Sequence, residues 1–223
     1  MPLTDGETLL RGYDADKGYV YVSFGRYPYE KNGAVRPCVW WVLAIENNYA
    51  LLLNNYVVDA GPIHHEKKNQ PTWKDHDIYT YLDTTMLETM FNDKEVAALQ
   101  DGVETGRLFI LDNAALMNID YGFRPIYTKV EKERECYATP WAHAVKKAYV
   151  EGSNGKTWYW SRTHRDVSHQ GYQCLIGYNG HISMGGYLRI GGIRPACYVD
   201  CSLLDGASGS GTLEDPYVFD LSR

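Results

Sequence analysis

The first sixty residues alternate between short apolar runs and polar breaks. Runs rich in Val, Tyr, Trp and Leu cover residues 19–23, 39–45, 50–53 and 56–60. β-Branched and aromatic residues in runs of this length are typical of strands, and Asn-rich breaks such as Glu46-Asn47-Asn48 are typical of turns. The pattern therefore predicts an antiparallel meander at the start of the chain.

The spacing of apolar residues becomes helical after the meander. Apolar side chains recur at this spacing from Ile78 to Phe91, and Asn92-Asp93-Lys94-Glu95 has the form of a capping box that opens a second helix. Residues 139–147 are expected to form a further short helix. We therefore expect two or three short helices after the first strands.

The rest of the chain contains further strand-like runs. We expect strands over residues 107–111, 158–160, 172–176, 181–183 and 193–199, with a turn at Tyr178-Asn179-Gly180. Residues 206–211 form a flexible Gly/Ser tract, and a last strand at 217–219 is expected to pair with a sheet edge or to lead into a following module.

Length and composition favour a single globular domain. The chain has 223 residues, of which 44% are hydrophobic and 22% are charged. We expect an α+β domain of antiparallel strands and short helices over residues 1–205, with a ligand-facing β region at about 157–200, and a flexible tract with a terminal strand over 206–223. The expected core residues are Trp41, Leu43, Leu82, Phe109, Trp160, Ile193 and Val199.

Charge and hydropathy exclude some partners. Lys and Arg total 22 and Asp and Glu total 28, which gives a net charge of −6 and makes a nucleic-acid partner unexpected. The sequence contains neither a long apolar run nor a signal peptide at its start. We therefore expect no membrane insertion and a cytoplasmic or virion-associated protein, while the oligomeric state has no signature in the sequence.

One stretch of the chain lacks two common residue types. Residues 157–213 contain neither Lys nor Glu, although 11 Lys and 12 Glu occur elsewhere. A Gly-rich β region that avoids long flexible side chains would explain this gap. Interfaces and antibody-like binding surfaces also deplete Lys and Glu and favour Tyr, Arg, His, Ser and Gly.

The second explanation predicts a recognition surface for a protein or carbohydrate ligand. Its side chains are expected to be exposed, with Tyr159 facing outward between buried Trp158 and Trp160, and with Ile176, Ile182 and Ile190 anchoring the loops from beneath. The predicted contact residues are Tyr159, Arg162, His164, Arg165, Asp166, His169, Tyr172, Tyr178, Asn179, His181, Tyr187 and Arg189.

Metal-binding and catalytic motifs are absent from the sequence. His64, His65 and His76 have no zinc-ligand spacing and are interpreted as solvated loop histidines, so no metal or cofactor is expected. The five cysteines are interpreted as reduced structural thiols. The alternating charges of residues 131–135 predict a solvated segment with local ion pairs. We expect no enzymatic activity.

Seven motifs in order resemble an uncharacterised bacterial and phage family of domains of unknown function with C-type-lectin-like folds. The motifs span roughly residues 20 to 201. They are Phe24-Gly25-Arg26-Tyr27-Pro28, Trp41 to Ile45, Trp73 to Ile78 with Tyr81-Leu82-Asp83, Arg107 to Leu111, Trp160-Ser161-Arg162, Gly180 to Ser183 and Gly192 to Ala196. The resemblance implies a C-type-lectin-like domain whose C-terminal β region faces a ligand.

The resemblance also suggests comparing the chain with two groups of lectin-like proteins, the variable proteins of diversity-generating retroelements and the calcium-dependent sugar-binding lectins. Variable proteins of diversity-generating retroelements rewrite surface codons near the end of the chain, and the rewritten codons cannot encode Lys, Glu, Gln, Met or Trp. Between Ser161 and Gly191, only Gln170, Gln173 and Met184 fall outside the permitted set. The motifs of calcium-dependent sugar binding are absent, so binding without calcium is expected.

Two other functions stay open. One is an oxidase similar to formylglycine-generating enzymes, which use a C-terminal cysteine pair, because Cys174, Cys197 and Cys201 lie in the C-terminal region. The other is a structural module of a surface or phage-tail assembly, which the flexible tract and the strand after it would suit.

Overall fold

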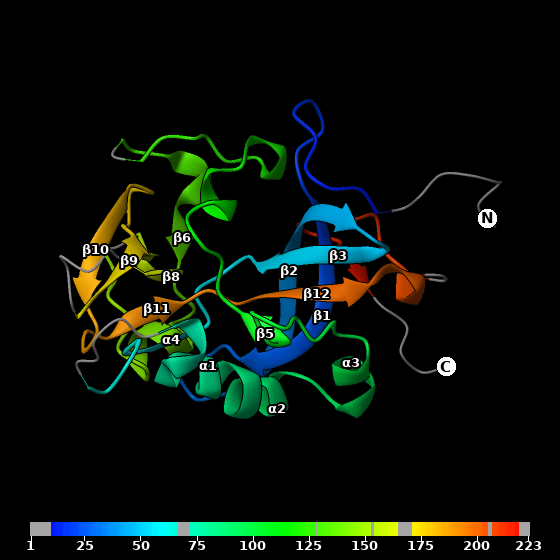
Figure 1. Ribbon diagram of the computed structural model, residues 1–223. Helices are drawn as coiled ribbons and strands as arrows, with labels where there is room; N and C mark the ends of the chain where they lie inside the picture. The colour runs from blue at the N-terminus through cyan, green and yellow to red at the C-terminus, as the bar shows by residue number, and fades with distance from the viewer. Residues whose placement is uncertain are drawn as a thin grey trace.

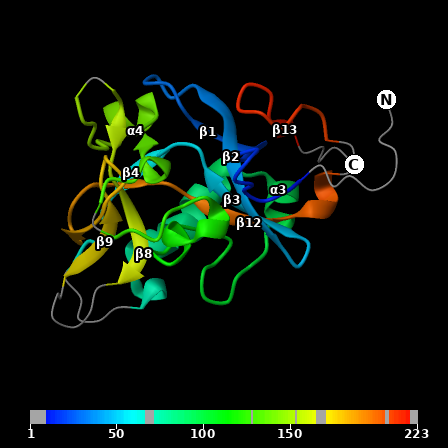
Figure 2. The same cartoon turned by 90° about the horizontal axis from the view of Figure 1, so that it is seen from above.

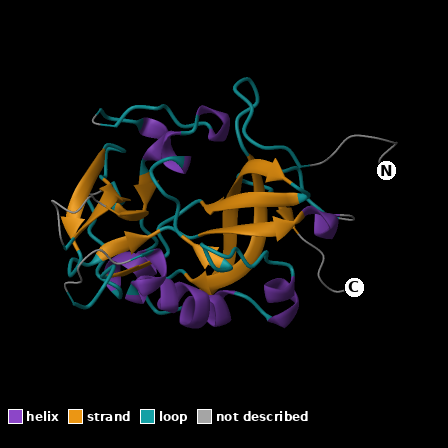
Figure 3. Cartoon of the chain, viewed as in Figure 1, coloured by secondary structure: helices purple, strands orange, loops and turns teal. Residues whose placement is uncertain are grey.

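The strands of the molecule form two main groups, with the α-helices along one side and further helical turns elsewhere (Figure 1, Figure 3). The computed structural model describes residues 10–66, 72–127, 129–152, 154–164, 171–204 and 207–218. These residues form a mixed α+β structure in which most neighbouring strands are antiparallel. The predicted fold class is confirmed at this level.

The first sheet has six strands in the order β13-β1-β2-β3-β12-β5. In that order the strands are Tyr217–Val218, Val20–Pro28, Val35–Glu46, Tyr49–Asn54, Ala196–Asp200 and Leu108–Phe109. The predicted meander is β1, β2 and β3, which pair antiparallel. The predicted terminal strand, β13, pairs in parallel with the edge of β1, with Val22 opposite Tyr217.

The second sheet has five strands in the order β10-β9-β8-β11-β4. In that order the strands are Ile182–Gly186, Tyr172–Ile176, Tyr159–His164, Gly191–Ile193 and Asp59–Gly61. Neighbours are antiparallel except β8 and β11. A separate pair joins β6 (Cys136–Tyr137) to β7 (Lys156–Thr157).

Short helices connect and cover the sheets. α1 (Asp77–Tyr81), a π-helical turn η2 (Leu82–Met86) and α2 (Leu87–Met90) follow one another without a break. α3 (Asp93–Ala97) begins with the predicted capping box, in which Asn92 accepts from the N–H of Glu95 and Glu95 accepts from the N–H of Asn92. The N-cap Thr139 opens α4 (Pro140–Ala144). The 3₁₀ turns are η1 (Trp73–Asp75), η3 (Ala115–Met117), η4 (Ile119–Tyr121), η5 (Lys132–Arg134) and η7 (Cys201–Leu204).

The core consists of two hydrophobic clusters, and each contains residues from both sheets. Leu52 of β3 belongs to the cluster that includes the helical residues Leu82 and Met86. Its neighbours Leu51 and Leu53 belong to the other cluster, because successive side chains of a strand point to opposite faces. Of the predicted core residues, Trp41 is half-buried, and the following are buried as expected: Leu43, Leu82, Phe109, Trp160, Ile193 and Val199.

The helices of the described ranges are short. Among them there is none with the length and apolar character needed to cross a membrane.

Candidate ligand-binding surface

The turn between β9 and β10 is a tight loop built on two glycines. Gly177 donates its N–H to the carbonyl of His181 at 2.8 Å, and Gly180 donates to the carbonyl of Gly177 at 2.8 Å. Gly180 has a φ of +78°, and a Cβ there would lie 1.8 Å from the carbonyl oxygen of Glu131. A Cβ at Gly177 would collide with the His181 imidazole, so the ring lies directly against this backbone.

A buried arginine fixes this turn from below. Arg134 donates through Nε to the carbonyl of Gly180 at 2.7 Å. Its guanidinium also donates to the carbonyls of Leu116, Arg124 and Ile126, at 3.1, 3.0 and 2.6 Å. Five fixed donors on a planar group suit this task, because a single side chain can satisfy several carbonyls at once. The turn therefore has a rigid support.

The sequence interpretation of this charged segment is wrong. Residues 131–135 were expected to be solvated, yet Arg134 is fully buried and Glu131 is buried. Neutral carbonyls stabilise the Arg134 cation here, and a charge pattern along the sequence does not reveal such partners.

Two indoles pack on a glycine at the other side of the surface. Trp158 and Trp160 meet edge to face with their ring centroids 5.0 Å apart. A Cβ on Gly191 would lie 2.3 Å from Nε1 of Trp160 and 2.5 Å from Cζ3 of Trp158. The exposed Arg189 places its guanidinium carbon 5.0 Å from the centroid of the Trp158 ring.

Between the turn and these indoles lies a groove of about 350 Å³. Its lining contains aromatic, cationic and small polar side chains and no carboxylate. The lining residues are Tyr149, Trp158, Leu175, Gly177, Tyr178, His181, Ser183, Met184 and Arg189. The structure thus brings three predicted contact residues, Tyr178, His181 and Arg189, to one groove. We call it the β10 groove.

Two predicted contact residues are buried, and their assignment to an exposed surface is wrong. Tyr159 has 2% exposure and Tyr187 has 1%. Strand β8 lies inside the second sheet with a hydrophobic cluster on each face, so Tyr159 is covered just as Trp158 and Trp160 are. The Tyr159 hydroxyl donates to the carbonyl of Arg134 at 2.9 Å.

Tyr187 follows β10 in a turn that folds back onto the histidines. Its ring centroid lies 5.4 Å from that of His76, and its hydroxyl is 3.0 Å from Nδ1 of His164. His164 is half-buried in this group. Ile190, expected beneath the loops, is 43% exposed, whereas Ile176 and Ile182 are buried as expected.

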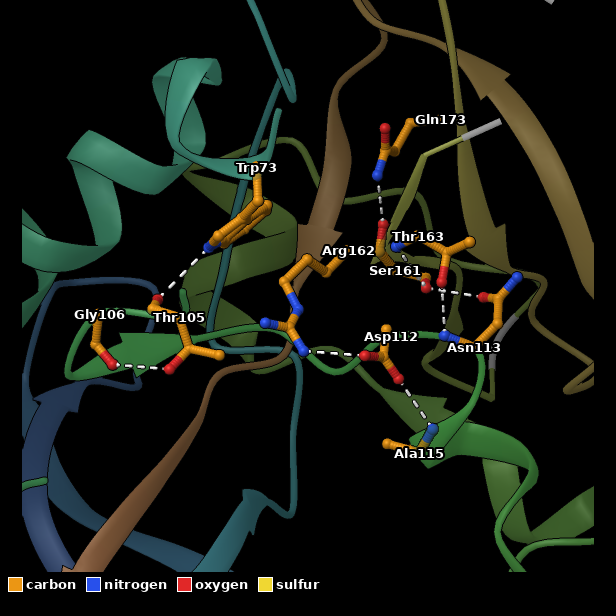
Figure 4. Close-up of polar contacts among 10 residues, drawn as sticks. All are labelled: Trp73, Thr105, Gly106, Asp112, Asn113, Ala115, Ser161, Arg162, Thr163 and Gln173. Carbon is orange, nitrogen blue, oxygen red and sulfur yellow. Dashed lines mark hydrogen bonds and ion pairs between the residues drawn. The ribbon is translucent and has the colours of Figure 1, made fainter. Parts of the chain in front are cut away.

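Arg162 belongs to a different groove (Figure 4). It donates to the carboxylate of Asp112 at 2.8 Å and lines a cavity of about 410 Å³ with Phe109 and Tyr121. Behind it, Ser161 donates to the side chain of Asn113 at 2.7 Å, and Gln173 donates to the carbonyl of Ser161 at 2.9 Å. These bonds tie β8 to Asn113 and to β9, and Arg162 lines this cavity and not the β10 groove.

The remaining predicted contacts are dispersed. Tyr172 is 48% exposed at the start of β9. Tyr172 and Leu175 are three residues apart on β9, so their side chains point to opposite faces of the sheet. Leu175 lines the β10 groove and Tyr172 does not. Asn179 is half-buried, and its side chain contacts the His181 ring. Arg165, Asp166 and His169 lie outside the described residues.

The histidines expected in solvated loops divide into two kinds. His65 is exposed, but His64 and His76 are buried, so the solvated interpretation is wrong for these two. Asp77 accepts a hydrogen bond from the N–H of His65 at 2.8 Å and lies 2.9 Å from Nδ1 of His64. Within the ranges that the structure describes, no group of three His, Cys, Asp or Glu side chains has the arrangement of a metal site.

All five cysteines are free thiols. Burial raises the pKa of the Cys197 thiol, and it also raises the pKa of the half-buried Cys201. Thiols of raised pKa are poor nucleophiles and poor metal ligands at neutral pH.

Sequence reasoning missed Tyr149, which enters the β10 groove from the segment before β7. Its neighbours in the sequence, Ala148 and Val150, give no signal for this placement, because the contact depends on the tertiary arrangement. Comparisons of the chain with protein-family models, with curated proteins and with solved structures give no match.

Proposed function

We propose that the protein is a recognition domain that binds a protein or glycan ligand, without calcium, in the β10 groove. The observation that carries this proposal is that Tyr178 and His181, on a rigid turn, meet Arg189 in one groove. Exposed Tyr and Arg side chains supply much of the binding energy at interfaces, and a rigid support lowers the entropic cost of binding.

The charge of the β10 groove indicates the kind of group it would bind. Its lining includes Arg189 and no carboxylate, and the Trp158 ring lies beneath the guanidinium. A carboxylate or carbonyl of the ligand could approach Arg189 from the open side, while Tyr178 offers an aromatic face. The exposed Leu188 and Ile190 beside Arg189 favour a protein ligand over a glycan.

The resemblance to lectin-like domains adds a more specific fold to this proposal. A C-type-lectin-like domain would carry its ligand on the C-terminal sheet, and diversification of the segment from Ser161 to Gly191 would change the ligand from copy to copy. The neighbouring DNA tests this part, because a near-copy of the 3′ coding segment beside a reverse transcriptase is expected. Absence of such a copy would contradict diversification and leave a recognition domain of fixed specificity.

The binding function is tested by applying labelled protein to a random peptide display library and to a glycan array, and by selecting the ligands that bind it. With any ligand so selected, Tyr178→Ala and Arg189→Ala should each weaken binding at least about tenfold, or about 1.4 kcal/mol. Tyr172→Ala is the matched control, because it removes an exposed tyrosine of the same sheet outside the groove. Selection of no ligand, or equal loss in the control, would contradict the proposal.

The oxidase alternative has its own test. We propose no catalytic activity, because a copper-dependent thiol oxidase would need accessible thiols and Cys197 is buried. Incubation with copper and a cysteine-containing sulfatase-type peptide should give no aldehyde. Aldehyde formation that vanishes in Cys197→Ser or Cys201→Ser would overturn this assignment.

A further inference from the structure

A larger groove, of about 420 Å³, lies on the first sheet, far from the β10 groove in the fold. The ends of β1 and β2, the segment after β3 and the C-terminal segment form its walls. Its lining includes Tyr29, Arg36, Asn54, Tyr56, Thr139 and Leu213. We call it the β1 groove. Its volume lies within the range of small-molecule binding sites.

The C-terminal segment with β13 lies beside β1 (Figure 2), and its residues Leu213, Glu214, Pro216 and Val218 line the β1 groove. Tyr21 donates its N–H to the carbonyl of Gly211 at 2.9 Å, and Val218 donates to the carbonyl of Ser208 at 2.8 Å. With the pairing of β13 to β1, these bonds hold the segment against the sheet. The groove is therefore formed by parts of the chain almost two hundred residues apart in the sequence.

The inner lining of the β1 groove is polar but uncharged. Asn54 has 1% exposure and accepts the N–H of Tyr56 through Oδ1 at 3.0 Å. Its Nδ2 neighbours the Cys38 thiol, whose pKa it lowers, and has no other hydrogen-bond partner among the described residues. Burial raises the pKa of Cys38 to about 12, so this thiol is neutral. A buried amide donor without a good acceptor is costly, and a ligand oxygen would satisfy it.

Tyr27 adds a neutral hydroxyl at the inner end of the groove. It donates to the buried carboxylate of Asp59, and burial and this carboxylate raise its pKa. Lys146 lies 3.2 Å from the same carboxylate and balances its charge. The Asp59 charge is therefore satisfied within the protein and does not demand a cationic ligand.

The outer part of the β1 groove is aromatic. The rings of Tyr29 and Tyr56 meet edge to face with centroids 5.9 Å apart. Arg36 lies over Tyr29, 4.6 Å from its centroid, and forms an ion pair with Glu30. Among the lining residues, charge is confined to Arg36 and Glu214, which have opposite signs.

We propose that the β1 groove is a second binding site and that it takes an uncharged saccharide. Such a ligand combines hydroxyl groups, which can accept from Asn54 and exchange hydrogen bonds with Thr139, with an apolar ring face that can lie against Tyr29 or Tyr56. An anionic ligand would have to compete with Glu30 for Arg36. The balanced charge, the buried amide and the aromatic walls together fit a neutral ligand rich in hydroxyls.

The proposal is tested by titrating ¹⁵N-labelled protein with glucose, N-acetylglucosamine and cellobiose. Each sugar is added up to about 20 mM, which is enough to detect a dissociation constant near 1 mM. At least one sugar should give saturable shifts of the Asn54 side-chain amide and the Tyr56 backbone amide. Tyr29→Ala should weaken this binding at least tenfold, whereas Tyr29→Phe should retain it, because the ring and not the hydroxyl makes the contact.

Leu213→Ala gives a second measurement that does not depend on the folding of Tyr29→Ala. Leu213 is 41% exposed on the groove wall, so its truncation should leave the fold intact and weaken binding about threefold. Arg189→Ala, in the other groove, should leave sugar binding unchanged. The proposal is overturned if none of the three sugars gives saturable shifts, or if Leu213→Ala and a folded Tyr29→Ala both bind like the wild type.

Discussion

The two sheets are packed by different means. The first sheet combines aliphatic side chains, such as Leu51, Leu52 and Leu53 of β3, with scattered aromatic rings, such as Trp40 and Phe24, and its residues belong to both hydrophobic clusters. The second sheet is filled by indoles that lie on glycines, and its turn is held by a buried arginine that binds carbonyls. A ring also lies on a glycine in the first sheet, where Phe91 packs on Gly25 of β1. The two sheets therefore differ in the paired indoles and the buried arginine of the second sheet.

This difference changes the meaning of the Lys- and Glu-free stretch. Tyr159 and Tyr187 are buried, and Gly191 is needed beneath Trp158 and Trp160. Much of the unusual composition of the second sheet therefore serves packing, as the Gly-rich explanation of the gap expected. The exposed remainder, around Tyr178 and Arg189, is the part that recognition can use.

The largest expected effect is on Arg134. Arg134→Met should lower the free energy of unfolding by at least about 3 kcal/mol, because four carbonyls lose a charged donor and two of these hydrogen bonds are buried. Arg189→Met, at an exposed arginine in the loop between β10 and β11, should cost less than about 1 kcal/mol. Urea unfolding measures both. A loss below about 1 kcal/mol in Arg134→Met would show that the turn does not depend on this arginine.

Alkaline pH should affect the second sheet through Tyr159. Burial, partly opposed by Arg194, raises the pKa of Tyr159 to about 12 from 10.0. The folded state therefore keeps this proton longer than the unfolded state, and the stabilisation present below pH 10 is lost as pH rises toward 12. A difference of two units between the folded-state and unfolded-state pKa corresponds to about 3 kcal/mol of unfolding free energy.

Urea unfolding of the wild type and of Tyr159→Phe at several pH values from 9 to about 11.5 isolates this contribution. The variant should be less stable at pH 9, because the hydrogen bonds of the hydroxyl to Arg134 and Arg194 are lost. Its stability should then fall less steeply above pH 10. Parallel curves for the two proteins would contradict a raised pKa at this tyrosine.

A pair of facing glycines tests the close packing of the indoles. Gly191→Ala should cost about 2 kcal/mol, since the new methyl group collides with both Trp158 and Trp160. Its cross-strand partner, Gly61, has open space where a Cβ would lie, with no atom within 4 Å, so Gly61→Ala should change stability by less than about 0.5 kcal/mol. Thermal unfolding compares the two. Equal effects would mean that the sheet, and not the indole contact, limits the substitution.

The smallest effect is expected for the exposed side chains. The double variant Tyr172→Ala with Arg189→Ala should keep its melting temperature within a few degrees of the wild type, because both side chains are exposed. Differential scanning calorimetry measures this change. Unfolding of the double variant would show that the exposed part of the second sheet is also structural.

Local signals in the sequence predicted local structure. The meander follows from runs of β-branched and aromatic residues, and α3 begins at Asn92 because its capping box needs only four consecutive residues. The position of the turn between β9 and β10 was likewise predicted, at Tyr178-Asn179-Gly180, and Gly180 there has a positive φ. Each of these features depends on neighbours in the sequence.

Features that depend on distant parts of the chain were not predicted. The alternation of side chains along residues 158–160 predicted that Tyr159 faces solvent. However, β8 is an inner strand whose two faces are both covered. The role of Arg134 depends on carbonyls from three separate segments. The contact residues were spread over several surfaces for the same reason, and among the described ones Tyr178, His181 and Arg189 share the β10 groove.

The position of β12 in the first sheet bears on how the chain folds during synthesis. β12 lies between β3 and β5, so Leu53 pairs with Ala196, which is more than a hundred residues later in the sequence. Until the ribosome has released that strand, β3 has an unpaired edge rich in leucine. Such long-range pairing slows folding and exposes aggregation-prone edges. Nascent chains that stop before β12 should therefore need chaperones, whereas the finished chain can close its first sheet.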